Sequence, residues 1–155
     1  MEPKTLEAFL TLTYIFLPCI LGYLHTFIKG DKVAANVFLG YYIFIAVGLQ
    51  GLLTGYWQIA KPEFVVDYVQ WPYSPFLLEL GMANIAFGVL GIFSLWRGQG
   101  WQAAAATGYG LFLFLTGIGH LLDILHHGPT PGSAGSFLFG DLLVPLILFL
   151  LGVLA

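Results

Sequence analysis

Long apolar stretches are the feature that most constrains what this chain can fold into. Five such stretches follow one another, at 7–28, 34–59, 75–96, 102–125 and 137–155. A helix needs about 20 mostly apolar residues to cross the hydrocarbon core of a bilayer. Only 8% of the residues are charged, against about 25% in an ordinary soluble domain. The sequence therefore predicts an all-α integral membrane bundle of five transmembrane helices.

The links between the stretches are short, and without an internal repeat they predict a single transmembrane domain over residues 1–155. Residues 29–32 and 97–100 are turn-like, and residues 126–136 form a loop rich in Gly and Pro. The longest link, residues 61–75, carries apolar and aromatic side chains and is expected to lie along the membrane interface. Four tryptophans fall at or near span ends, as an aromatic belt would place them: Trp57, Trp71, Trp96 and Trp101.

Five spans put the two termini on opposite sides of the membrane. Basic residues are fewer on the side of the N-terminus, Lys4 and Lys61, than on the other side, Lys29, Lys32 and Arg97. The positive-inside rule therefore favours an N-out, C-in orientation.

Several features indicate packing rather than chemistry. The single cysteine, Cys19, lies inside the first span, which excludes an intrachain disulfide and a CxxC motif. Gly51 with Gly55, and Gly88 with Gly91, form small faces that are expected to be helix contacts. The chain has no basic patch for nucleic acid.

Three acidic residues, Glu79, Asp123 and Asp141, fall inside the predicted spans, where no Lys or Arg is present to pair with them. A charge at the centre of a membrane helix costs about 2.5–3.5 kcal/mol on insertion scales. Such a carboxyl must therefore stay protonated, form hydrogen bonds, or bind a cation. With a rise of 1.5 Å per residue, Glu79, His120 and Asp141 lie about 6–8 Å from the membrane face that holds the N-terminus. We expect these three to converge in a buried cluster.

The histidines of the fourth span differ in their expected environment. His120, Asp123 and His127 are spaced i, i+3 and i+7, so they share one helical face. His120 is expected in the interior, with Asp123 bordering it. His126 and His127 are interpreted as polar residues at the membrane surface.

A metal site is the first hypothesis for this cluster, with Glu79, His120, Asp123 and Asp141 as ligands. Carboxylate and imidazole suit a divalent ion such as Zn, Fe or Mn, and the lack of thiolate argues against Cu(I). Three further polar residues, Tyr14, Gln50 and Asn84, lie deeper in the same half and are expected to contact a bound ligand or to bond between helices. A b-type haem is disfavoured because His25 lies near the opposite face.

Other functions stay open. Glu79 and His120 could exchange protons, with Asp123 or Asp141 orienting the imidazole. A small polar, lipid-like or quinone-like ligand would suit the aromatic surroundings, and the site could be catalytic. The chain could also be an accessory subunit of a larger membrane complex, or a homo-oligomer, with a purely structural polar network.

Three segments resemble a family of small multi-pass membrane proteins of bacteria and archaea whose function is unknown. They are SPFLLELGMANIAFGVLGIFSLW (74–96), GYGLFLFLTGIGHLLD (108–123) and FGDLLVP (139–145), and the resemblance spans about residues 70–146. The pattern of that family falls on Glu79, Asn84, Gly119-His120 and Asp141 with Pro145. The resemblance implies a shared site in a prokaryotic cytoplasmic membrane and supplies no activity. Asp123, His126 and His127 lie outside the pattern.

Overall fold

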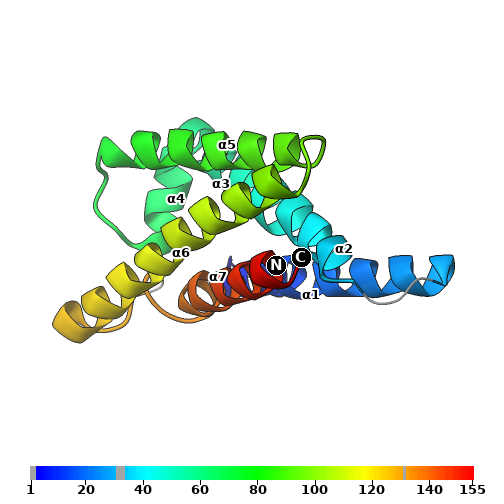
Figure 1. Ribbon diagram of the computed structural model, residues 1–155. Helices are drawn as coiled ribbons and strands as arrows, with labels where there is room; N and C mark the ends of the chain where they lie inside the picture. The colour runs from blue at the N-terminus through cyan, green and yellow to red at the C-terminus, as the bar shows by residue number, and fades with distance from the viewer. Residues whose placement is uncertain (1–2, 31–33, 131) are drawn as a thin grey trace.

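Helices make up the fold in the computed structural model, which describes residues 3–30, 34–130 and 132–155 and has no strand in those ranges (Figure 1). Along the chain they are α1 (Pro3–Lys29), α2 (Ala35–Tyr42), the π-helix η1 (Ile43–Leu49), α3 (Gln50–Ala60), α4 (Pro62–Val69), α5 (Phe76–Ser94), α6 (Gln99–His127) and α7 (Ser136–Leu154). The predicted all-α class is confirmed. Lys32 and Pro131, from two of the predicted links, lie outside the described residues.

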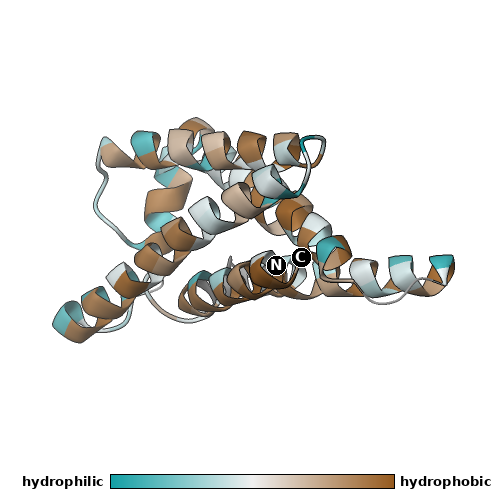
Figure 2. Cartoon of the chain, in the orientation of Figure 1, coloured by the Kyte–Doolittle hydropathy of each residue, from teal (hydrophilic) through white to brown (hydrophobic). Residues whose placement is uncertain are grey.

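In the described part of the chain, four helical segments are long and apolar enough to cross a membrane, and each agrees with a predicted span to within three residues at either end. They are Phe9–Lys29, Ala35–Ala60, Phe76–Ser94 and Gln99–His127. The fifth, α7, is apolar but shorter, with Leu138–Leu154 as the described apolar part. The count of five spans therefore stays a prediction. Figure 2 shows apolar residues along the helices, with hydrophilic ones at the α5–α6 turn and the far end of α6.

The second span is continuous but changes partners along its length. Its first part, α2, packs against α1 and α7, whereas α3 packs against α5, and the π-helical segment η1 joins the two. A π-helix is rare, and its wider turns occur mostly as short insertions within α-helices.

Glycines bring α3 and α5 into close contact along the upper edge of Figure 1. A Cβ atom on Gly51 would lie 2.8 Å from the carbonyl oxygen of Asn84, and one on Gly55 would lie 2.6 Å from that of Gly81. Gly88 lines the same interface, and Gly91 continues it against Val47 and Gly48 of η1. The two glycine pairs predicted to be helix contacts are thus confirmed, because only residues without a side chain allow backbones so near.

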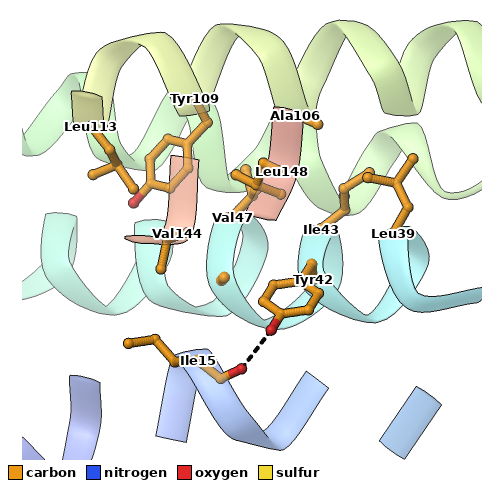
Figure 3. Close-up of a cluster of buried hydrophobic side chains, with 11 residues drawn as sticks. Ile15, Leu39, Tyr42, Ile43, Val47, Ala106, Tyr109, Leu113, Val144 and Leu148 are labelled. Atoms are coloured by element: carbon orange, nitrogen blue, oxygen red, sulfur yellow. Dashed lines mark hydrogen bonds between the residues drawn. The ribbon is translucent and has the colours of Figure 1, made fainter. Parts of the chain in front are cut away.

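The hydrophobic core lies between α1, α2, η1, α6 and α7 (Figure 3). Val47, Ala106 and Leu148 are almost completely buried there. At its edge the Tyr42 hydroxyl donates a hydrogen bond to the carbonyl oxygen of Ile15, at 2.7 Å, and so ties α2 to α1.

The predicted interfacial link forms the short helix α4. It starts with Pro62 at a first-turn position, where the missing N–H leaves no hydrogen bond unmade. It ends at Val69, and the φ of the next residue, Gln70, is 57°, in the left-handed region. The chain then turns sharply toward α5 and carries Trp71 with it.

The C-terminus lies beside the start of α6, where the side-chain amide of Gln99 donates a 3.2 Å hydrogen bond to the carbonyl oxygen of Ala155.

We expect single cysteines at Thr5 and Ala155, in a Cys19→Ala background, to react with an impermeant maleimide from opposite sides of a sealed vesicle. The cysteine-free protein is the control. Labelling of both positions from one side would rule out five spans.

Candidate functional site

His120 of α6 and Asp141 of α7 form a close pair of ionisable side chains at one end of the bundle. Nε2 of His120 lies 3.3 Å from Oδ2 of Asp141, and the two side chains are only 9% and 15% exposed. The close approach depends on Gly117, where a Cβ would lie 2.9 Å from a methyl group of Leu142. The predicted meeting of His120 with Asp141 is therefore present in the structure.

Trp71 covers the imidazole of this pair. Its ring centroid lies 5.6 Å from that of His120, with the two planes inclined by 34°. The sequence indicated Trp71 only as a member of an aromatic belt. Its role beside His120 follows from the turn after α4, which returns the chain to the end of the bundle where α6 ends and α7 begins.

The α6–α7 loop packs against this turn. A Cβ on Gly132 would lie 2.8 Å from the carbonyl oxygen of Val69 and 3.1 Å from Cε2 of Trp71. Ser133 is fully buried, and its hydroxyl accepts a 3.1 Å hydrogen bond from the backbone N–H of Thr130. The two links at this end therefore hold each other in place around Trp71.

A pocket of about 390 Å³ lies on the α4–α5 side of Trp71. Its walls are mainly apolar, and they include Val69, Phe76 and Leu77 as well as Trp71. Glu79 lines the pocket and is exposed. The expectation that Glu79 is buried is wrong, because α5 begins only at Phe76 and keeps this residue in its first turn. The positive end of the helix dipole favours an acid there.

Asp123 belongs to the exposed end of α6 rather than to the buried pair. Its Oδ1 lies 3.0 Å from Nδ1 of His127, whose side chain is 74% exposed. His126 and His127 are both exposed, as predicted. Residues four apart on a helix are neighbours, so His127 is within reach of this carboxylate.

The described part of the chain contains no group of three or more His, Cys, Asp or Glu side chains that could hold a metal ion. Of the four predicted ligands, His120 and Asp141 form one pair, Asp123 pairs with His127, and Glu79 lines the pocket. The geometry therefore gives no support to the predicted metal site.

The three deeper polar residues have different surroundings. The side-chain amide of Asn84 donates to Oε1 of Gln58 at 2.9 Å and to the carbonyl oxygen of Leu80 at 3.1 Å, so it links α5 to α3. Tyr14 packs against the hydrophobic core. Oε1 of Gln50 is buried and has no hydrogen-bond partner among the described residues. Gln58 is a polar partner that the sequence did not indicate.

An all-helical bundle with four helices of membrane-spanning length is the architecture of a multi-pass membrane protein. The chain belongs to a family of unknown function (DUF6790), whose model matches residues 8–155. The resemblance seen in three segments thus extends over nearly the whole chain. No curated protein and no solved structure was found to match it.

Proposed function

We propose that this membrane protein binds a small amphipathic ligand at the end of the bundle that holds His120, and that the His120–Asp141 pair exchanges a proton with the polar head of that ligand. The observation that supports the proposal is the buried pair itself, with Nε2 3.3 Å from Oδ2 beneath the Trp71 ring. An intramembrane ionisable pair is a functional candidate by default.

The pair has the chemistry of an oriented base. The carboxylate of Asp141, 3.3 Å from Nε2, favours the proton on that nitrogen, and Nδ1 is then the nitrogen that can take up a second proton. A histidine held in this way by a carboxylate can act as a general acid or base toward a bound group.

The neighbouring pocket indicates the class of ligand. Phe76, Leu77 and Trp71 offer an apolar wall, and Glu79 offers a hydrogen-bond acceptor at its edge. Ligand sites combine mostly apolar walls with a few polar groups that fix orientation. A quinone-like or lipid-like molecule, with its head toward Glu79 and Trp71, fits this lining.

Binding can be measured through Trp71 after Trp57, Trp96 and Trp101 are replaced by Phe. We expect decylubiquinol, the reduced quinone whose hydroxyls can donate to the carboxylate, to quench the remaining fluorescence saturably, and Glu79→Gln to weaken this binding about tenfold. A hydrogen bond to a charged group contributes about 1.5–3 kcal/mol, which supports a change of that size. Glu63→Gln, on the exposed face of α4, is the matched control and should bind normally.

A bromine-labelled lysolipid serves as the second probe. If the pocket takes a lipid-like ligand, this probe should quench Trp71 saturably and displace the quinol. Absence of saturable quenching with both probes, or identical affinities in Glu79→Gln and Glu63→Gln, would overturn the ligand proposal.

Proton exchange can be followed through Trp71 in the same protein. A protonated imidazole quenches a neighbouring indole, so a proton passed from bound decylubiquinol to His120 should add to the quenching of Trp71. His120→Gln should remove this added quenching, whereas His126→Gln and His127→Gln should leave it unchanged. Equal quenching in His120→Gln and in the wild type would overturn proton exchange by the buried pair.

Two predictions from the sequence stand beside this proposal. The N-out, C-in orientation rests on the distribution of basic residues. Membership of a larger membrane complex, or self-association, would be indicated by a stoichiometric partner chain that copurifies with the protein in mild detergent. In that case the buried pair would serve to fix the bundle.

A further inference from the structure

A second groove lies at the opposite end of the bundle, between α1, α2 and the end of α5. Its volume is about 320 Å³, and it is lined by His25, Asn36, Val37, Gly40, Tyr41, Phe44 and Leu95. The walls are mainly apolar, with polar groups contributed by His25, Asn36 and Tyr41. None of these residues takes part in the site around His120.

Gly40 keeps this groove open. A Cβ built on Gly40 would have no atom within 4 Å, in contrast to the glycines between α3 and α5. Gly40 lies within α2, where glycine is less favourable than alanine by about 1 kcal/mol. Helix packing therefore does not require a glycine at this position, and a larger side chain would project into free space.

Polar and basic groups on one side of the groove are suited to bind an anion. Nδ1 of His25 lies 3.1 Å from the Tyr41 hydroxyl. When that hydroxyl donates to Nδ1, the imidazole carries its proton on Nε2 and can donate it to a bound oxygen. Lys29 follows His25 by one turn of α1 and is exposed, and the guanidinium of Arg97 stacks 4.6 Å from the Phe93 ring centre.

Among the described residues, this end of the bundle carries basic residues and no acidic ones. Its basic residues are Lys29 and Arg97, whereas the described acids lie on the first turns of α1, on α4, in the first turn of α5, in the last turns of α6 and in the first turns of α7, toward the other end. Basic residues at a membrane surface attract anionic lipid, each contributing about 1 kcal/mol.

We propose that this groove binds one anionic phospholipid. An acyl chain lies along Gly40, Phe44 and Leu95, and the phosphate is bound by His25, Lys29 and Arg97. Because the groove opens on the outer surface of the bundle, a phospholipid can enter it directly from the surrounding bilayer. The proposal is independent of the ligand site at the opposite end.

Native mass spectrometry of the intact protein can test this, with phosphatidylglycerol and phosphatidylcholine supplied in equal amounts. We expect one retained phosphatidylglycerol in the wild type. Lys29→Gln and Arg97→Gln should each lower its preference over phosphatidylcholine about fivefold, the factor that corresponds to about 1 kcal/mol per charge.

Gly40→Leu should fill the groove and abolish retention of either lipid. Gly152→Leu is the matched control, because a Cβ there also meets no atom within 4 Å but lies on α7 away from the groove. Equal retention by Gly40→Leu and Gly152→Leu would overturn the proposal. So would a wild type that retains phosphatidylcholine as readily as phosphatidylglycerol, a result that does not depend on any variant folding.

Discussion

Gly55→Ala is expected to destabilise the bundle by about 1–3 kcal/mol, the usual effect of adding atoms to a tightly packed interior. The added Cβ would lie 2.6 Å from the carbonyl oxygen of Gly81 and 2.7 Å from Ile85. The nearest atom belongs to backbone, so it cannot move aside by a change of rotamer, and α3 and α5 would have to separate. Thermal unfolding in detergent, followed by circular dichroism, measures the effect.

Gly119→Ala is the control for this experiment. Gly119 also lies within a helix, but a Cβ there meets nothing within 4 Å. Its replacement should stabilise α6 by up to about 1 kcal/mol, the difference in helix propensity. Effects of the same sign and size at the two positions would show that close contact of α3 with α5 does not stabilise the protein.

A double-mutant cycle over His120→Leu and Asp141→Leu should give a coupling energy of about 1–2 kcal/mol, near the upper end of that measured for hydrogen bonds between membrane helices. Each single variant leaves a buried polar partner unpaired, whereas the double variant leaves neither. The free energy of unfolding of the double variant should therefore be close to that of either single variant.

A second His–Asp pair in the same chain provides the control for this cycle. Asp123 and His127 form a pair of the same residue types at an even shorter distance, 3.0 Å, but at the exposed end of α6. Their coupling should not exceed about 0.5 kcal/mol, as for other exposed pairs one turn apart. Coupling at the buried pair that is no larger than at this one would mean that water or lipid headgroups reach His120.

Membrane spans and glycine contacts could be predicted because each depends on a local property of the sequence. The hydropathy of about 20 residues decides whether a helix can cross a bilayer. The spacing of Gly51 and Gly55 places both on one face, and such a face in a membrane helix has few uses besides close packing. The partner of Gly55 was not predictable in this way, since Gly81 lies on another helix whose register the sequence does not state.

The pairing of Asn84 with Gln58 shows why depth along a span is a poor guide to contact. By depth Asn84 lies level with Gln50, but it bonds to Gln58. Side chains on a helix point back toward its N-terminus. On antiparallel α3 and α5 that tilt moves Gln58 and Asn84 toward one another, while it moves Gln50 away.

Only the His120–Asp141 part of the candidate site could be predicted from the sequence. His120 and Asp141 lie close to the two ends of one short loop, so an antiparallel α6 and α7 must bring them to the same level. Trp71 and Glu79 depend instead on where the turn after α4 ends and α5 begins. Those boundaries are set by Gln70 in a left-handed conformation and by Phe76 as the first helical residue, and no periodicity in the sequence marks either one.

The π-helix η1 gives the second span one place where its length can change at little cost. A π-turn holds more residues than an α-turn, so deletion of one residue between Ile43 and Leu49 should convert the segment to α-helix and leave α2 and α3 close to their present orientations. Deletion of one residue within α2 should be tolerated far less, because each α-helical residue turns the chain by about 100°. The Gly51 and Gly55 face would then leave α5 while the first turn of α2 still faced α1 and α7.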